Sequence, residues 1–556
     1  MDWQRSGLIA AMILVFGFLF IQWNEFRDTH KPAAPLLSEE ALVIPGDIPG
    51  TDIKPQPSLA VPELSKDPAP DVTPELVFSD ARLITVRTDV LEVTIDTLGG
   101  DIVKVELLEY LLTQDADSKP FVMLNRTQNQ TYIAQSGLIG PNGTDTQAER
   151  PQYHVKQKEF VLLEGAKELI VELSLEDKGV SIRKEFVFKP SDYLIDVRYK
   201  INNYTENAWR AHLFGQIQRD TFNPNKQSAM GPRPYLGMAI STEEDNYKKL
   251  DFEDIAEESF KTSKTGGWVA MVQHYFVSAW VPNQEQDNQY QLRKLGQSEL
   301  YAGGFTGPAI DVLAGEEGIL AASFYVGPKD QQRLADISPY LDLTIDYGWL
   351  WWVAKPLFAG LQLINNVLQN WGWSIIVLTI VVKLMFFPLS AASYRSMARM
   401  RKLQPEMTRL RELYSDDRQK LSQEMMGLYK KEKVNPVGGC FPMLIQMPVF
   451  IALYWVLNES VELRHTPWIL WIKDLSMKDP YYVLPVLNGI SMFVLQSLQP
   501  APPDPTQAKV MKIMPVAFSF FFMFFPAGLV LYWTVNSVLS IAQQWVITRK
   551  IVGKEG

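Results

Sequence analysis

Cysteine is almost absent from this chain of 556 residues, in which Cys440 is the single copy. An intrachain disulfide is therefore excluded, and so is a metal site built from several thiolates. Histidine is scarce as well, and its five copies lack the sequence spacing of metal ligands: His30, His154, His212, His274 and His465. We therefore expect no metal site and no cofactor.

An overall excess of positive charge is also lacking. The net charge is −10, and most of the acidic excess lies in the first 350 residues. No strongly basic domain is present, which argues against a direct nucleic-acid partner. The sequence also lacks the Gly-x-x-x-x-Gly-Lys-Ser/Thr loop that cradles nucleotide phosphates, and it shows no internal duplication of the kind found in transporters. Energy coupling by a nucleotide is therefore not indicated.

Long uncharged runs are present, and they divide the chain. They cover 6–24, 356–382, 434–458, 480–503 and 513–548. A helix that crosses a bilayer requires ~20 such residues. The last run is too long for one span, and Pro526-Ala-Gly528 breaks it into two with a tight turn. We predict six spans, of which the first (residues 1–25) is an uncleaved signal anchor ending at Trp23. A cleaved signal peptide is the alternative.

Between the first two spans the pattern changes twice. Residues 26–75 are rich in proline, which favours an extended linker over a packed core. Residues 76–342 alternate apolar and polar side chains in short runs separated by Gly, Asn, Asp and Pro clusters. This period of two predicts an all-β sandwich. The region is large for one sandwich, so we expect an extended one.

The later part of the chain is predicted to be helical. Residues 343–370 carry Trp349, Trp351 and Trp352 near Lys355, which suits a helix in the headgroup region. The second to sixth spans follow at 371–390, 434–460, 480–499 and, for the last two, 510–548. Between the second and third spans, residues 391–433 hold eleven Lys/Arg against six acids, with an apolar stripe at helical spacing. They predict an antiparallel helical hairpin, for which a merely self-packed pair with a solvated basic face is the alternative.

Lysine and arginine accumulate in the hairpin, in the last loop and in the tail at 549–556. Because these residues favour the cytoplasmic side of short loops, both termini are predicted to be cytoplasmic and the β domain periplasmic. The flanks of the first span disagree, with Arg5 inside and Arg27 and Lys31 outside. The loops of the five later spans carry the larger excess of lysine and arginine, so they decide the predicted orientation in the membrane.

Lys383 interrupts the second span about five residues before Pro388. An ammonium group is costly at such depth, so an ionisable residue there indicates a functional site. The competing interpretation is that its flexible stem reaches the cytoplasmic headgroups. Thr379 lies four residues earlier, on the same face of the predicted helix. No Asp or Glu lies within the uncharged runs to act as a proton relay.

The strongest motif is Val434-Asn-Pro-Val-Gly-Gly-Cys-Phe-Pro-Met-Leu-Ile-Gln-Met-Pro-Val-Phe450. Together with 423–426, 460–464, 479–482 and 525–532, it resembles the bacterial YidC family of membrane protein insertases, which is related to the oxidase-assembly and Albino insertases. Residues 267–276 resemble the Gram-negative form. The resemblance extends over nearly the whole chain in the expected order.

The resemblance implies a five-helix core around a hydrophilic groove, a periplasmic β-supersandwich and a cytoplasmic hairpin. The groove would be open to cytoplasm and lipid and closed to the periplasm. The family's groove cation aligns with Lys383, and Thr379 and Gln446 match polar groove positions. Two features depart from the family. Lysine replaces the usual arginine, and Trp533 replaces the second tyrosine of a pair, with Asn536 at a nearby small polar position.

The resemblance also implies a role and partners. The chain would be an insertase and chaperone of the inner membrane rather than an enzyme. It would act on nascent membrane proteins, alone or with the Sec translocon, and would meet the ribosome and the signal-recognition-particle pathway through the hairpin. Membrane lipid would be a further partner. Adaptable apolar side chains would form a hydrophobic slide, for which ordinary lipid-facing filler is the alternative: Met443, Met447, Met514, Phe518 and Met523.

Two other functions remain open at this point. A transporter or channel subunit would give solute or ion flux in vesicles that contain only this protein. An enzyme in the β domain is the second alternative, because the family's supersandwich resembles sugar mutarotases. It would require an acid/base pair in one pocket, and His154, His212 and His274 are candidates only by residue type.

Overall fold

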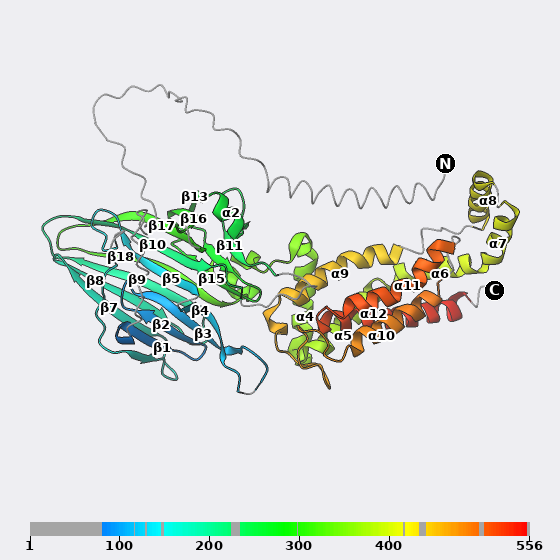
Figure 1. Cartoon of the computed structure of the whole chain (residues 1–556), viewed down its shortest axis with the longest axis horizontal. Coiled ribbons are helices and arrows are strands. Elements are labelled where there is room, and N and C mark those ends of the chain that lie inside the picture. Colours follow the sequence, from blue (N-terminus) through cyan, green and yellow to red (C-terminus); the bar gives the residue numbers. More distant parts are fainter. Residues whose placement is uncertain are drawn as a thin grey trace, which may run out of the picture.

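The computed structural model describes residues 80–115, 117–127, 130–145, 150–223, 234–296, 299–414, 417–432, 441–499 and 505–552. The predicted signal anchor and proline-rich linker lie outside these residues. The described chain has two halves set end to end, with strands at one end and helices at the other (Figure 1).

The β half holds two sheets. The larger has ten strands, in the order β13 (Phe260–Thr265), β16 (Asp287–Lys294), β17 (Leu300–Val312), β10 (Trp209–Asp220), β5 (Thr131–Ile139), β4 (Pro120–Arg126), β3 (Asp101–Leu111), β2 (Leu91–Asp96), β1 (Leu83–Arg87) and β6 (Glu159–Val161). The smaller has eight, in the order β12 (Lys248–Leu250), β11 (Gly237–Ile240), β14 (Val269–Val272), β15 (Phe276–Val281), β18 (Glu317–Pro328), β9 (Leu194–Asn203), β8 (Val180–Phe188) and β7 (Leu169–Asp177). The named strands pair antiparallel, except that β1 and β6 are parallel. Two short helices accompany them, α2 (Phe252–Glu257) and α3 (Gln331–Ile337).

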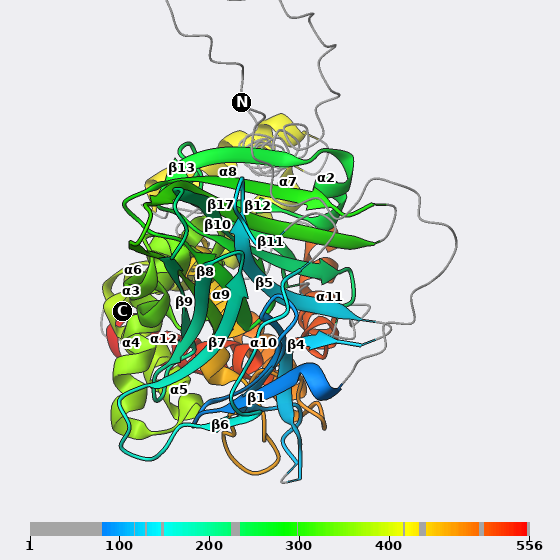
Figure 2. The same ribbon diagram turned by 90° about the vertical axis from the view of Figure 1, so that its left-hand side faces the viewer.

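The two sheets pack face to face, as the alternating sequence predicts (Figure 2). Along β9, buried and half-buried residues alternate strictly. Trp280 of β15 lies 4.8 Å from the Phe324 ring and donates its indole N–H to the Gln216 carbonyl of β10 at 3.2 Å. Tyr132 of β5 and Ser278 of β15 share a second bond between the sheets, at 2.8 Å. The predicted sandwich is therefore confirmed.

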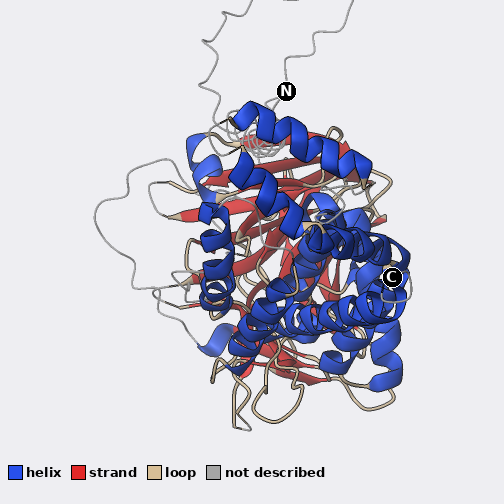
Figure 3. Ribbon diagram, turned by 90° about the vertical axis from the view of Figure 1, so that its right-hand side faces the viewer, coloured by secondary structure: helices blue, strands red, loops and turns tan. Residues whose placement is uncertain are grey.

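The helical half contains nine α-helices within the described residues. They are α4 (Trp351–Leu368), α5 (Trp371–Met385), α6 (Phe387–Lys402), α7 (Gln404–Leu413), α8 (Arg418–Lys431), α9 (Phe441–Glu459), α10 (Val483–Ser497), α11 (Pro505–Phe522) and α12 (Ala527–Val546). Figure 3 shows them in front of the strands when the molecule is viewed from the helical end. The last uncharged run is broken as predicted, but slightly earlier than expected: α11 ends at Phe522, and Ala527 and Gly528 already belong to α12.

The predicted helix over 371–390 does not run straight. The first part, α5, ends at Met385, and the chain bends by 67° at Phe386 before α6 begins. Pro388 lies in the first turn of α6, where its missing N–H is tolerated, but it cannot continue an uninterrupted helix. Among the described residues, no single helix is long and apolar enough to cross a membrane, whereas the bent pair α5–α6 meets both criteria jointly. The count of six spans stays a prediction.

The predicted hairpin contains parts of three helices instead of two: α6, α7 and α8. The apolar stripe is split between α6 and α7 at Leu403, because Pro405 starts a new helix. Met397 and Met407, on either side of this break, are both buried. The Tyr429 hydroxyl of α8 lies 4.0 Å from the Met407 sulfur, so α8 folds back onto α7. These helices lie at the end farthest from the β half (Figure 1).

A short turn, η5 (Val461–Leu463), follows α9 and lies against the β half. Arg464 donates from Nη2 to the Leu111 carbonyl at the end of β3, at 2.6 Å. Burial raises the pKa of Glu462 to about 7, and the nearby Asp330 carboxylate adds to the shift. A carboxyl group whose pKa is raised on folding costs stability once the unfolded chain ionises. This cost grows between pH 4.5 and about 7 and is constant above.

Replacing Glu462 with glutamine is therefore expected to raise the thermal unfolding temperature at pH 8 and to leave it nearly unchanged at pH 4.5. The physical reason is that glutamine keeps the shape of the side chain and removes the buried charge. Thermal unfolding of the full chain in detergent, followed by tryptophan fluorescence at both pH values, checks this. A lower unfolding temperature for the variant at pH 8 would contradict it.

Candidate functional site

Helix α12 is the element on which the predicted groove residues converge. It packs against α5, α9 and α10. Four polar residues follow one another at intervals of four along it, so they share one face of the helix: Tyr532, Asn536, Ser540 and Gln544. We call this face, together with Trp533 and Gln543 beside it, the polar seam of α12.

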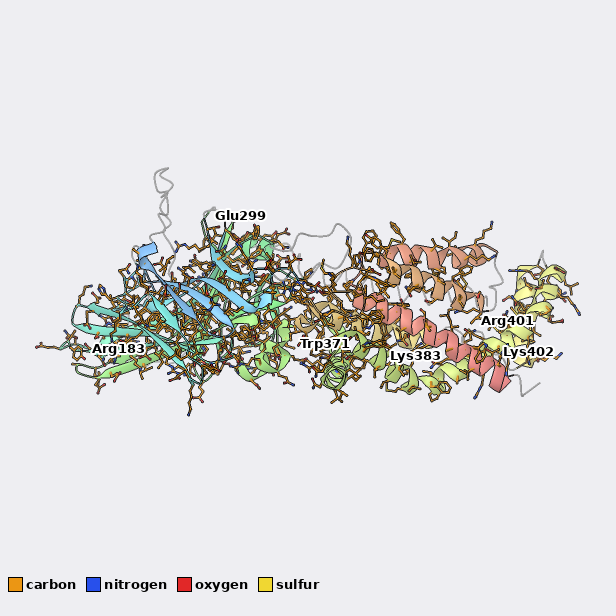
Figure 4. The ribbon with its side chains drawn as sticks, turned by 90° about the horizontal axis from the view of Figure 1, so that it is seen from below. Arg183, Glu299, Trp371, Lys383, Arg401 and Lys402 are labelled. Carbon is orange, nitrogen blue, oxygen red and sulfur yellow. The ribbon has the colours of Figure 1, made fainter. Side chains whose placement is uncertain are left out.

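Lys383 faces the polar seam. Its side chain is buried, with 9% exposed, and Nζ donates to the Ser540 hydroxyl at 2.8 Å. That hydroxyl donates in turn to the Asn536 backbone carbonyl at 2.7 Å. Lys383 makes no ion pair with any described residue, so its nearest polar partner is neutral. Figure 4 places Lys383 along the helical half between Trp371, near the β half, and Arg401 and Lys402 toward the far end.

A pocket of about 220 Å³ opens beside Lys383, where α5, α6 and α12 meet. The surface that faces the pocket is apolar. Eight residues surround it, and Lys383 and Gln543 among them contribute only apolar atoms to this surface: Ile380, Lys383, Leu384, Phe387, Leu539, Ala542, Gln543 and Val546. Because a water molecule takes ~30 Å³ of liquid volume, the pocket has room for several. The surface of the pocket itself is apolar, and the Lys383 ammonium is directed to Ser540 instead. The snorkelling interpretation therefore stays open.

Gln446 reaches the same seam from α9. Its Nε2 donates to the Tyr532 hydroxyl at 2.6 Å. Trp533 is next to this bond and packs edge-on against Phe450 of α9 at 4.6 Å. Thr379 is buried on α5 but donates its hydroxyl to the Ile375 carbonyl of its own helix, at 2.6 Å. Of the predicted groove residues, only Thr379 is thus occupied within its own helix.

Several buried polar atoms of the seam have no hydrogen-bond partner within the described part of the chain: Trp533 Nε1, Asn536 Oδ1, Gln543 Oε1 and Gln544 Oε1. Buried polar groups in folded proteins are nearly always paired with protein or with water. Four such atoms on one helix, next to a buried cation, form a surface that can bind water or a polar chain segment.

The predicted slide residues lie on α9 and α11. Met447, Met514 and Phe518 expose more than a third of their surface, which suits contact with lipid or with an apolar helix. Met523 is half-buried in the turn after α11. The side chain of Met443 lies outside the described residues. The slide therefore stays a prediction, supported by the exposure of three of its members.

Sequence reasoning missed Ser540 and Tyr532, which make the two side-chain bonds to the predicted groove residues. A signal was present for both, because they continue the interval of four through Asn536. A serine in an apolar helix usually bonds its own backbone, so its type alone does not indicate a site. Here the hydroxyl does so and also accepts from Lys383.

The three histidines of the β half are held by separate partners. The His154 backbone pairs with Ser174, His212 Nδ1 bonds the Gly307 carbonyl at 2.9 Å, and His274 Nε2 bonds the Asn458 carbonyl at 2.8 Å. No two of them contact each other in the described structure. The geometry therefore gives no support to an acid/base pair built from these residues.

Two family models match the chain. The one described as YidC periplasmic domain covers residues 83–359, and the one described as 60Kd inner membrane protein covers residues 363–554. The Membrane protein insertase YidC of Cellvibrio japonicus is 54% identical over 558 residues, which cover 99% of each chain. The proteins of the same name from Ectopseudomonas mendocina and Azotobacter vinelandii are 48% and 49% identical, and cover 99% of this chain and 98% and 99% of their own.

Solved structures give more distant likenesses. An active YidC insertase with its first transmembrane domain resolved matches 83% of this chain and 92% of its own, at 19% identity and a TM-score of 0.37. A galactose mutarotase related enzyme from Lactobacillus acidophilus matches 44% of this chain and 97% of its own, at 9% identity and a TM-score of 0.31. Neither likeness carries an argument about function. The sequence relatives, which are about half identical over almost the full length, show that this chain belongs to the YidC family of membrane protein insertases.

Proposed function

We propose that this chain inserts newly made proteins into the bacterial inner membrane and assists their folding. The single observation that carries the proposal is the position of Lys383, a buried cation that faces a neutral, incompletely bonded polar seam. An ammonium group without a fixed counterion can attract a carboxylate that enters from outside. At 4 Å such a pair is worth ~4 kcal/mol at an effective dielectric constant of 20.

In the proposed mechanism, Lys383 transiently attracts acidic residues in the short extracytoplasmic segment of a substrate. The polar seam of α12 and Gln446 then supply hydrogen-bond partners along the path. This shortens the stretch of hydrocarbon that the polar segment must cross, where an unpaired polar group costs several kcal/mol. The apolar helix of the substrate leaves into lipid along α9 and α11, past Met447, Met514 and Phe518.

The proposal includes an arrangement in the membrane. Six spans place both termini and the basic hairpin in the cytoplasm and the β half in the periplasm, in agreement with the distribution of lysine and arginine. The hairpin helices α7 and α8 would then meet the ribosome and the signal-recognition-particle pathway. The Sec translocon would be a partner for larger substrates.

Photocrosslinking from position 383 to a ribosome-bound nascent membrane protein tests the proposal. We expect adducts between residue 383 and the extracytoplasmic segment of the substrate, and adducts between 447 or 514 and its apolar helix. A probe at Val381 is the matched control, because this residue lies on the same helix and is exposed on another face. Equal adducts from 381 and 383, or none from 383, would contradict the proposed path.

A further inference from the structure

The loop between α9 and α10 carries an exposed apolar turn. The Trp468 N–H donates to the Ile472 carbonyl at 2.9 Å, and the Ile472 N–H donates to the Ile469 carbonyl at 3.1 Å. Leu470 stands at the apex with 80% of its surface exposed, and Ile469 beside it is 38% exposed. We call residues 468–472 the apolar tip. In Figure 1 the loop lies at the end of the helical half that adjoins the strands.

The composition of this turn is unusual for a loop that faces water. Residues 466–472 contain no charged side chain, and Lys473 follows directly. Leu470 has a φ of 53°, in the left-handed region that a leucine rarely adopts. Turns that need a positive φ usually carry glycine, asparagine or aspartate there. A large apolar side chain at such an apex is explained by an apolar partner and not by the turn itself.

The apolar tip adjoins the start of α5. The ring of Trp468 lies edge-on to that of Trp373 at 5.9 Å, and a Cβ atom at Gly372 would collide with the Trp468 ring. Trp373 lies in the first turn of α5 and is 46% exposed. The tip is therefore next to the exposed face of α5, at the end of this helix opposite to Lys383.

The same loop is bonded to the starts of two other helices. The Met477 carbonyl accepts from the N–H of Ala527, the first residue of α12, at 2.7 Å. Asp479 is 1% exposed, and its Oδ2 accepts from the Leu484 N–H in the first turn of α10 at 2.7 Å. The loop thus lies at the level where the apolar helices α5, α10 and α12 begin. In a membrane, this level is the boundary between headgroups and acyl chains.

We propose that the apolar tip inserts into the periplasmic leaflet and anchors the helical half there, with phospholipid as its partner. Tryptophan is enriched at this depth, where one part of its ring is apolar and the other polar. The Trp471 indole N–H is already bonded to Asp479 Oδ1 at 3.0 Å, so it needs no water there. The exposed ammonium of Lys473 would face the lipid phosphates.

This inference goes beyond the proposed function and rests only on the proposed arrangement of the spans. It gives the helical half an anchor of its own at the periplasmic surface, built from one loop and independent of the strands.

Depth-dependent fluorescence quenching tests the anchor. The full chain with Cys440→Ser and Leu470→Cys is labelled with an environment-sensitive fluorophore and reconstituted into phosphatidylethanolamine/phosphatidylglycerol vesicles. These vesicles contain a phospholipid with a nitroxide near either the carbonyl end or the methyl end of an acyl chain. Because interfacial segments lie only ~5–10 Å into this boundary, we expect at least about threefold stronger quenching by the shallow nitroxide. Ile469→Cys provides a second labelling position.

Two labelled positions are the controls. Ile319→Cys replaces an apolar residue of β18 that is 59% exposed. Ile319 is in register, through Lys200, with Arg183, which lies at the end of the β half far from the helices (Figure 4). Neither nitroxide should quench it. Ile490→Cys lies in the middle of α10 and is 56% exposed, so the deep nitroxide should quench it strongly.

A further substitution tests whether Leu470 drives the insertion of the tip. With the label at Ile469→Cys, Leu470→Asp is expected to lower quenching by the shallow nitroxide at least about twofold, because a carboxylate is disfavoured among acyl chains. Leu470→Met keeps an apolar side chain of similar size and is expected to leave the quenching unchanged.

Three results would overturn the anchor. One is quenching at position 470 no stronger than at 319, and another is unchanged quenching in Leu470→Asp. The third is absence of quenching at position 490, which would refute the proposed arrangement of the spans and the anchor with it. No substrate takes part in these measurements, so they decide the anchor whether or not the chain inserts proteins.

Discussion

Replacing Lys383 with glutamate is expected to lower insertion of single-span substrates with acidic extracytoplasmic segments by about tenfold or more, since the change turns an attraction of a few kcal/mol into a repulsion. The reversal acts at the only cation of α5, next to a seam that carries no opposing charge. The measurement is the integration of such a substrate into vesicles. It is expressed as the ratio of the protected fragment to the total translation product.

If Lys383 acts through its charge, substitutions at this position should change insertion in graded steps. Lys383→Arg is expected to keep insertion near the native level, because it preserves the charge. Lys383→Gln is expected to lie between native and Lys383→Glu. Lys509→Glu is a matched reversal on an exposed part of α11 and is expected to change little. A substrate with basic extracytoplasmic residues should lose less with Lys383→Glu. Normal insertion of acidic substrates by that variant would refute the charge role.

Replacing Lys184 with methionine is expected to destabilise the β half by about 3–5 kcal/mol. Lys184 of β8 is fully buried, and its Nζ donates to three carbonyls of the other sheet and its turn: Gly99 at 2.9 Å, Gly100 at 2.8 Å and Ser136 at 3.1 Å. Burial lowers the pKa of Lys184 to about 7. The nearby Asp101 and Asp145 carboxylates oppose this shift of the pKa.

The charges near Lys184 make the loss larger. Arg150 pairs with Asp101 and lies 3.1 Å from Asp145, so the two acids are balanced by two cations within one buried cluster. Methionine fills a similar volume but leaves three carbonyls unpaired and one negative charge in excess. For a domain of this size the unfolding temperature is expected to fall by about 10 °C.

Thermal unfolding of the full chain in detergent measures this loss. Lys189→Met is the control, since Lys189 sits just after the same strand and its partly exposed ammonium lies 3.4 Å from Asp196. We expect a change of less than about 1 kcal/mol there. Equal effects of the two substitutions would show that the Lys184 cluster contributes no more than a surface pair.

The fold was predictable where local pattern decides it. The period-two runs specify the sandwich because a strand exposes alternate side chains to the core, and Pro526-Ala-Gly528 specifies the break between α11 and α12. The early end of α5 was not predictable from its apolar run, since 371–390 contains no charge other than Lys383 and the bend depends on the backbone near Pro388. The length of an apolar run indicates whether a helix could span a bilayer, but it does not indicate whether the helix is straight or bent.

The site was predictable only in part. Lys383 stands out because an ammonium in an apolar run is costly. Gln446 and Asn536 came from the resemblance. Ser540 lies at the interval of four from Asn536, but its bond to Lys383 depends on the packing of α5 against α12. The contact between Lys329 and Glu459 joins residues 130 positions apart, and neither shows a local pattern that indicates a partner. Such long-range pairs follow from packing of the two halves and require the structure.

The bend at Phe386 also has an electrostatic consequence. Because α5 stops at Met385, Lys383 lies in the last turn of that helix, where aligned peptide dipoles leave a partial negative charge. A cation there is favoured by ~0.3–1 kcal/mol, and more when partly buried. A straight helix through Ser390 would move this negative end more than a turn away. The end of α5 therefore stabilises the Lys383 ammonium without a carboxylate partner. An acidic residue of the substrate would then have no fixed anion to displace.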